Sequence, residues 1–185
     1  MEIESVFPEI EAIEDDALRT AVSSAWTSAA GVNGIEIDEL EAVPWYPPAQ
    51  LELGLDADDV LLVDHVRDVI ECALGLAESL SDRAYTPDVD VDTVLAGALV
   101  HDVSKLYEFD GMDETEIERL LGHPHFGVAI AARANLPVEV IHVILAHTPR
   151  TAVEPATIEA ELVRRADEAA AAAIRANVIE DLRGP

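Results

Sequence analysis

Apolar residues recur at helical spacing along most of the chain, and no segment alternates convincingly as a strand would. The pattern predicts helices over residues 8–30, 58–80, 91–105, 115–121, 125–134, 137–147 and 157–181. The 91–105 segment is almost entirely apolar, which indicates a helix buried on all sides. Residues 35–40 show the only trace of strand character. The sequence therefore predicts an all-α fold, a bundle of about five to seven helices.

The helical pattern breaks at residues 31–56, where glycines, Asn33 and prolines favour turns. We divide the chain here into an N-terminal helix with an irregular extension, residues 1–56, and a main helical domain, residues 57–185. The Pro44–Pro48 stretch marks the boundary, and its Trp45-Tyr46 pair is expected to fix the segment onto the core. We expect the two parts to form one compact unit.

The charge balance excludes several classes of partner. Asp and Glu number 38 against 11 Lys and Arg, for a formal net charge of −27, while half of the residues are apolar, which is enough to build a core. Binding to nucleic acid or to an anionic membrane needs basic patches, and the sequence has none. Its first residues do not resemble a signal peptide, and no apolar run is long enough to cross a bilayer. We therefore expect a cytoplasmic protein with neither nucleic acid nor membrane as a partner.

Two residue types are nearly missing. Lys105 is the only lysine, and the other basic residues are all arginine. An acidic excess with so little lysine resembles the proteins of salt-in halophiles, and we infer a halophilic archaeon as the source; an acidic protein of an ordinary cytoplasm is the alternative. Cys72 is the only cysteine, which excludes an internal disulfide, and the pattern places it in the core of its helix.

Several helices bring potential metal ligands toward one interior. Helical geometry places His65 and His147 within the apolar arcs of their helices, and Asp167 at the edge of such an arc. A carboxylate there is costly to bury unless it is paired or binds a metal. The dipeptide His101-Asp102 follows the most apolar run, and His123 lies at the break between two helices. Histidine and carboxylate ligands without cysteine suit Fe, Mn, Ni, Co or Zn, and two such ions close together make a hydrolytic site.

These residues resemble the HD-domain superfamily of metal-dependent phosphohydrolases, which is named for a His…His-Asp…Asp constellation. The sequence HDVSK at 101–105 resembles the His-Asp-x-x-Lys motif of its HDIG-like branch. The sequence HPHFG at 123–127 resembles a His-Pro-x-x-Gly element, and LAHTP at 145–149 occurs where that branch places another histidine. The resemblance covers about residues 57–175, and the Gly-Tyr-Pro portion of the HD-GYP cyclic-dinucleotide hydrolases is absent.

The resemblance implies an HD-type helical bundle and a role for each matching residue. A first divalent ion would be bound by His65, His101, Asp102 and Asp167. Asp102 would bridge to a second ion, which His123 and His147 complete. Lys105 would hold the phosphate or the attacking water, and it is the catalytic candidate together with Asp102.

Other polar residues near these motifs are secondary candidates. Arg150 and Arg83 are candidates for contacts with phosphate, with a solvated surface position as the alternative. We assign His125, His142 and Glu159 to the surroundings of the ligands or to the surface.

The resemblance implies an enzyme that hydrolyses a nucleotide or another small phosphate ester with one or two metal ions. One alternative is a mixed-valence di-iron oxygenase on the same fold, and another is a non-catalytic metal-binding or sensing domain. The role of residues 1–56 and the formation of a homodimer stay open.

The charge balance predicts a salt response. Self-repulsion of a net charge of −27 strains the compact state at low ionic strength, whereas the Debye length falls to about 3 Å in molar salt. The free energy of unfolding should therefore rise between low and molar KCl, as measured by thermal or denaturant unfolding. A flat response would count against a halophilic protein.

Overall fold

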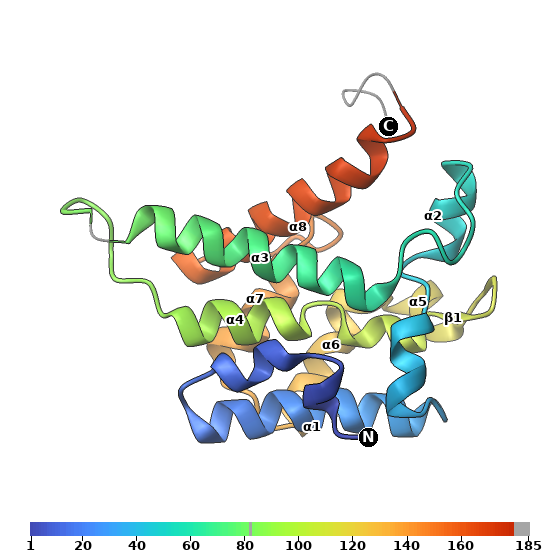
Figure 1. Ribbon diagram of the computed structural model, residues 1–185, viewed down its shortest axis with the longest axis horizontal. Coiled ribbons are helices and arrows are strands. Elements are labelled where there is room, and N and C mark those ends of the chain that lie inside the picture. The colour runs from blue at the N-terminus through green and yellow to red at the C-terminus, as the bar shows by residue number, and fades with distance from the viewer. Residues whose placement is uncertain (82, 180–185) are drawn as a thin grey trace.

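A computed structural model describes residues 1–81 and 83–179 (Figure 1). Its α-helices are α1 (Asp16–Val32), α2 (Pro47–Glu52), α3 (Leu62–Leu80), α4 (Val91–Val100), α5 (Glu116–Leu120), α6 (Gly122–Arg133), α7 (Val138–Ala146) and α8 (Ile158–Ala176). Short 3₁₀ helices are η1 (Ile3–Ser5), η2 (Pro8–Ala12), η3 (Ile37–Ala42) and η4 (Val103–Tyr107). Strands β1 (Phe109–Asp110) and β2 (Asp113–Glu114) form a small antiparallel hairpin. The all-α prediction is confirmed.

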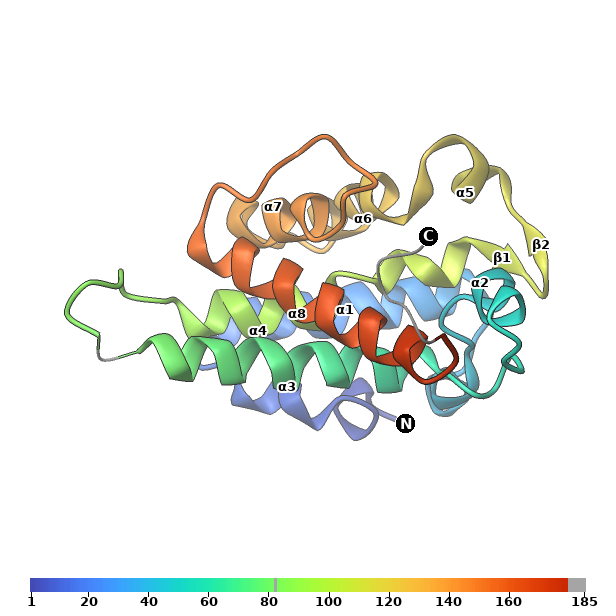
Figure 2. The same cartoon turned by 90° about the horizontal axis from the view of Figure 1, so that it is seen from above.

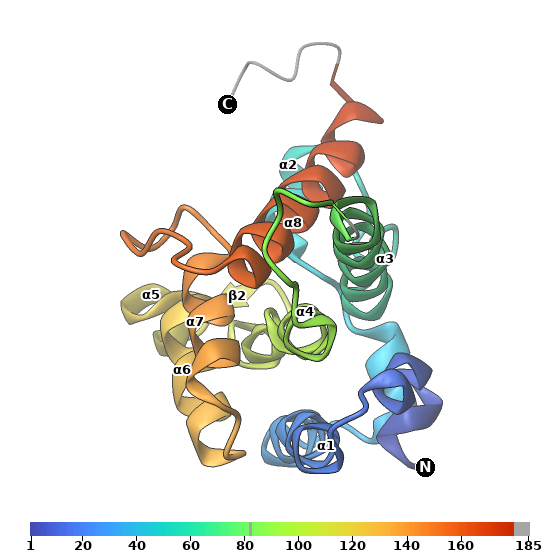
Figure 3. The same ribbon diagram turned by 90° about the vertical axis from the view of Figure 1, so that its left-hand side faces the viewer.

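Helix α4 lies in the middle of the bundle and contacts α1, α3, α7 and α8 (Figure 3). Every residue from Thr93 to Val100 is buried, as expected for a helix that is apolar all round. Helices α3 and α8 contact each other extensively beside it, and α6 and α7 form a second pair (Figure 2). The end of α4 is thus surrounded by protein, and the His101-Asp102 pair emerges there.

The first 56 residues share one hydrophobic core with the later helices. Phe7, Ile10 and Trp26 are fully buried in the same cluster as α4. The Trp26 indole Nε1 donates a hydrogen bond to the carbonyl oxygen of Leu99, 2.9 Å away, near the end of α4 where helical carbonyls lack partners in the helix. The N-terminal segment therefore braces the part of α4 that leads into the His-Asp pair; the domain boundary at residue 57 stays a prediction.

Several predicted helix bounds are wrong. The predicted 8–30 helix is two elements, because the carboxylate of Asp15 accepts from the backbone N–H groups of Ala17 and Leu18 and so starts α1 anew. The predicted 58–80 helix begins only at Leu62, after Leu61 makes an isolated β-bridge with Pro44.

Further bounds differ at the middle and end of the chain. The 91–105 segment ends as an α-helix at Val100 and continues as η4, and residues 37–42 form η3 instead of a strand. Helix α6 already begins at Gly122, whose φ of 70° suits glycine. Helix α8 ends at Ala176, and residues 180–181 of the predicted 157–181 helix lie outside the described residues.

Two other observations bear on the sequence-based predictions. Cys72 is exposed and not in the core, because it lies on the solvent side of α3 next to the buried Ala73. In the two described stretches, no helix is both long and apolar enough to cross a membrane.

Helices α4 and α7 approach each other closely at Gly97, and we therefore predict that a larger side chain there destabilises the protein. A Cβ added at Gly97 would lie 2.7 Å from Val143 Cγ1, so Gly97→Ala should lower the free energy of unfolding by about 1–3 kcal/mol. Gly75→Ala in α3 is the matched control. A Cβ at Gly75 meets nothing within 4 Å and should raise stability by up to about 1 kcal/mol through helix propensity. Equal effects of the two variants in denaturant unfolding would contradict the close packing at Gly97.

Candidate metal centre

One group of side chains brings together three helices, and we call it the His65 group: His65, His101, Asp102 and Asp167. His65 Nε2, from the first turn of α3, lies 3.1 Å from Asp167 Oδ1 in α8 and 3.6 Å from Asp102 Oδ2. His101 Nε2, at the end of α4, lies 3.6 Å from the same Asp102 oxygen and 3.9 Å from Asp167 Oδ1. His65, His101 and Asp102 therefore present ligand atoms close enough together to hold one ion, and Asp167 lies beside them.

The other oxygen of Asp102 faces a second set, the His123 group: Asp102, His123 and His147. Asp102 Oδ1 lies 3.5 Å from His123 Nε2 and 3.8 Å from His147 Nε2, and the two imidazole nitrogens are 3.2 Å apart. Two imidazole nitrogens this close together could both bind one ion. Asp102 is thus placed between two donor groups.

The hydrogen bonds of the imidazole rings orient their Nε2 atoms inward. His101 Nδ1 lies 2.7 Å from the Ala98 carbonyl oxygen, and His147 Nδ1 lies 2.6 Å from that of Ile144. An Nδ1–H that donates to a carbonyl leaves a lone pair on Nε2. His101 Nε2 is buried and has no hydrogen-bond partner among the described residues. A buried lone pair of this kind fits a metal ion.

Burial and neighbouring charges set the protonation states that ligands require. Burial, and then Lys105, lowers the pKa of His123 to about 3; burial, and then His101, lowers that of His147 to about 3. Both rings are therefore neutral at pH 7. Burial alone would raise the pKa of Asp102, but the neighbouring His101 and Lys105 oppose it, and the pKa lies well below its ordinary value. The pKa of Asp167 is also lowered, because its hydrogen bond with His65 and the neighbouring His147 and His101 together outweigh burial.

Trp45 is part of this site, although the sequence only suggested that it anchors its segment. Its indole Nε1 donates a hydrogen bond of 2.9 Å to Asp102 Oδ2, and its ring stacks on His65 at 4.1 Å between centroids. Backbone hydrogen bonds of Trp45 with Val60 and of Leu62 with Val43 hold the segment beside the start of α3. The sequence feature that could have indicated this role is the aromatic pair Trp45-Tyr46 directly after Pro44.

Glu108 is a second residue that sequence reasoning missed. It is fully buried, with Oε2 3.1 Å from Lys105 Nζ and Oε1 2.9 Å from His123 Nδ1. The Lys105 ammonium also lies over the Tyr46 ring, 4.3 Å from its centroid. The sole lysine is thereby fixed at the edge of the metal-ligand groups.

The structure brings only some of the secondary candidates to the site. Arg150 lies at its rim, with Nη1 3.1 Å from Glu118 Oε1 and Nη2 donating to the Tyr46 hydroxyl at 2.9 Å. Arg83 is exposed beyond the far end of α3, whose 19 residues span about 28 Å from the His65 end (Figure 1). It therefore does not lie near the phosphate position that the sequence suggested.

The remaining three candidates contact the backbone away from the ligands. His125 is exposed, with Nδ1 2.9 Å from the Leu121 carbonyl oxygen. His142 Nε2 accepts a hydrogen bond from the backbone N–H of Ala156, and Glu159 Oε1 accepts from that of Asp90. Their contacts are structural, and we do not assign them to the site.

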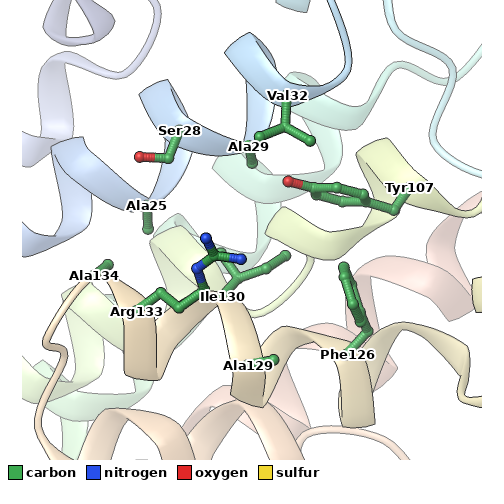
Figure 4. A pocket seen from close by; sticks show the side chains of 10 residues that line it. All are labelled: Ala25, Ser28, Ala29, Val32, Tyr107, Phe126, Ala129, Ile130, Arg133 and Ala134. Carbon is green, nitrogen blue, oxygen red and sulfur yellow. The ribbon is translucent and has the colours of Figure 1, made fainter.

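A cavity of about 340 Å³ opens onto the two ligand groups. Its walls include Trp45, Tyr46, Lys105, Thr148 and Arg150. A different cavity of about 440 Å³ lies between α1 and α6 (Figure 4). It is lined mainly by apolar side chains and has no metal-ligating residue, so the chemistry belongs to the smaller cavity.

A match to a known protein family agrees with the metal site that the geometry indicates. The HD domain family matches residues 62–172. The chain belongs to the HD domain family. Trp45 and Tyr46 precede the matched residues, so these two walls of the cavity come from outside the region that matches the HD family.

A similar protein is the dihydroneopterin 2',3'-cyclic phosphate phosphodiesterase of Methanocaldococcus jannaschii. It is 29% identical over 171 residues, which cover 86% of this chain and 65% of that protein. This HD-domain chain therefore spans just under two thirds of the relative's length. No solved structure matches the chain significantly.

The Trp45 hydrogen bond predicts a role in metal affinity. Trp45→Phe keeps an aromatic ring on His65 but removes the N–H donor to Asp102, and such partners of ligands contribute 10–100-fold to affinity in general. We expect roughly 10-fold weaker binding of Mn²⁺ or Zn²⁺ in titration calorimetry. Trp26→Phe removes an indole donor that contacts the Leu99 carbonyl and no ligand, and it should weaken metal binding less than Trp45→Phe does. Unchanged affinity in folded Trp45→Phe would contradict this role.

Proposed function

We propose that this HD-domain protein is a metal-dependent phosphohydrolase that acts on a small phosphate ester through the His65 and His123 groups. The observation that carries the proposal is Asp102, whose two oxygens face two sets of buried ligand atoms. The cyclic phosphodiester named for the relative is the first substrate class to test. The donor set of nitrogen and oxygen atoms without sulfur suits Fe, Mn, Ni, Co or Zn, as one or two ions.

In this proposal, His65, His101, Asp102 and Asp167 hold a first ion, and Asp102, His123 and His147 hold a second. Divalent ions at such sites supply a water of lowered pKa and neutralise charge on phosphoryl oxygens. Asp102 keeps the two groups of ligands in register because one carboxylate belongs to both. The neutral imidazoles of His123 and His147 present lone pairs without the cost of losing a proton.

The rest of the cavity handles the substrate. Lys105 offers a compact positive charge, which suits a phosphate oxygen, at the edge of the His123 group. Arg150 adds a second positive charge at the rim, held by Tyr46 and Glu118. These cations oppose the repulsion that an anionic substrate meets at a protein of net charge −27. A cavity of about 340 Å³ suits a small substrate more than a polymer.

We also propose a cytoplasmic setting, a small phosphorylated molecule as the partner, and no binding to nucleic acid. The charge of −27 supports the last point, since phosphate backbones are bound by basic surfaces.

The proposal is tested with protein purified in molar KCl. Bound metal per chain is measured, and Mn²⁺-, Ni²⁺- or Co²⁺-supported hydrolysis is assayed on a panel of cyclic phosphodiesters, mononucleotides and other phosphate esters. His101→Ala and Asp102→Ala should reduce hydrolysis by at least roughly 100-fold. Mutation of residues that only hydrogen-bond to metal ligands costs up to about 100-fold in activity, and loss of a ligand itself should cost at least as much. Asp64→Ala, an exposed neighbour of His65, is the control with unchanged activity.

The same material counts the ions. His123→Ala or His147→Ala should lower the metal content from about two per chain toward one. An unchanged ratio would mean that the His123 group holds no ion. Full activity of the Asp102→Ala variant, or oxygen-dependent turnover with bound iron in place of hydrolysis, would refute the phosphohydrolase.

A further inference from the structure

Glu108 occupies an unusual position for a carboxylate in so acidic a chain. Its side chain has no exposed surface, whereas most of the 38 acidic residues can remain in water. It follows η4 directly, one turn after Lys105 and outside the metal-ligand motifs that the sequence identifies. Burial of a carboxylate is costly unless charged or hydrogen-bonding partners compensate for the lost water. Its neighbours therefore indicate why it is retained.

The two oxygens of Glu108 have different partners. Oε2 lies 3.1 Å from Lys105 Nζ, and Oε1 lies 2.9 Å from His123 Nδ1. Neither oxygen nor His123 Nδ1 has a well-aligned hydrogen bond among the described residues, so the contacts are close ionic ones without ideal angles. The opposite nitrogen of the same imidazole, Nε2, faces Asp102 and His147. Glu108 thus touches the far side of a metal ligand and the sole lysine at once.

His123 differs from the other ligand histidines with a described Nδ1 contact. His101 and His147 place Nδ1 against carbonyl oxygens of their own helices. His123, in the first turn of α6, instead has the carboxylate of Glu108, while Ser104 Oγ donates to its backbone carbonyl at 2.7 Å. A carboxylate behind a ligand histidine fixes its tautomer and raises its basicity toward a metal.

We propose that Glu108 is a positioning residue that couples the His123 ligand to the Lys105 ammonium, so that metal binding and phosphate binding at the His123 group depend on one carboxylate. The part of this proposal that concerns phosphate binding deepens the proposed function and rests on it. The part that concerns metal affinity at His123 holds whether or not the protein hydrolyses phosphate esters.

Replacing Glu108 by glutamine tests these contacts, because an amide cannot accept from both donors as a carboxylate does. His123 Nδ1–H and the Lys105 ammonium are both donors, and a carboxylate accepts from both. The amide of a glutamine has one acceptor oxygen and one NH₂ donor, so it satisfies one partner and opposes the other. Aspartate keeps both acceptors and the charge but is one methylene shorter, and it should restore part of the effect.

The experiment titrates Mn²⁺ or Zn²⁺ into metal-free protein and measures the two binding equivalents by calorimetry. Glu108→Gln should weaken the second equivalent by roughly 10–100-fold and leave the first within about 3-fold, with Glu108→Asp intermediate. Glu116→Gln removes the same charge from an exposed position that, among the described residues, forms an ion pair only with Arg119, and is the matched control. Equal weakening of both equivalents, or of neither, would overturn the coupling.

A third ion is a distinct outcome, because Glu108, Glu118 and His123 also lie close enough together to hold one. Lys105 already brings positive charge to Glu108, so we expect no third equivalent. Loss of a third equivalent in Glu108→Gln, with the other two unchanged, would make Glu108 a ligand and would refute the positioning role.

The role of Glu108 in phosphate binding through Lys105 is tested by hydrolysis kinetics on any substrate that the wild-type protein turns over. At metal concentrations that saturate both sites in every variant, Glu108→Gln should raise KM and lower kcat together, and the double variant with Lys105→Gln should be no worse than Lys105→Gln alone. Additive losses would contradict action through Lys105. If neither Glu108 variant folds, a crystal structure of the metal-loaded wild-type protein decides: Glu108 between His123 and Lys105 supports the proposal, and Glu108 on an ion or turned away overturns it.

Discussion

The buried carboxylate of Asp102 is the constraint on which the rest of this structure depends. It is nearly inaccessible to water, and five helices or helix ends present nitrogen atoms and a second carboxylate around it. A carboxylate at this depth needs several partners, because burial alone would raise its pKa and favour the neutral acid. The bundle provides them by converging on the end of α4. The almost entirely apolar α4 thus has a second role, as the rigid support of the two polar residues that follow it.

The N-terminal segment contributes to the site from outside the region that matches the HD family. Trp26 holds the end of α4 from one side, and Trp45 reaches Asp102 from another. Neither residue falls within the 62–172 region that defines the HD family here. The candidate ligands therefore lie within the matched region, while two residues that orient them come from the segment before it. Such an arrangement lets the surroundings of a metal centre vary without changing the ligands.

Helical periodicity was sufficient to predict the all-α class and to place His65, His147 and Asp167 toward one interior, because facing is a local property of a helix. It did not identify Glu108 or Trp45, whose importance comes from contacts across long stretches of sequence. One buried glutamate cannot be distinguished by type among 38 acidic residues. Arg83 illustrates the opposite error: it follows the helix that carries His65, but the length of that helix carries it away from the cavity. The predicted single helix at 8–30 was wrong because Asp15 caps a new helix instead of continuing the first.

The contact between His123 and His147 links the stability of the protein to metal binding. A neutral imidazole has one proton, and in His123 two neighbours compete for it: the Glu108 carboxylate at Nδ1 and the His147 nitrogen at Nε2. Without a cation the site is frustrated, since satisfying one neighbour leaves the other facing a lone pair. A bound cation ends the competition by taking the Nε2 side. Metal would then act as a folding ligand, and the amount of native protein would follow the supply of metal by mass action.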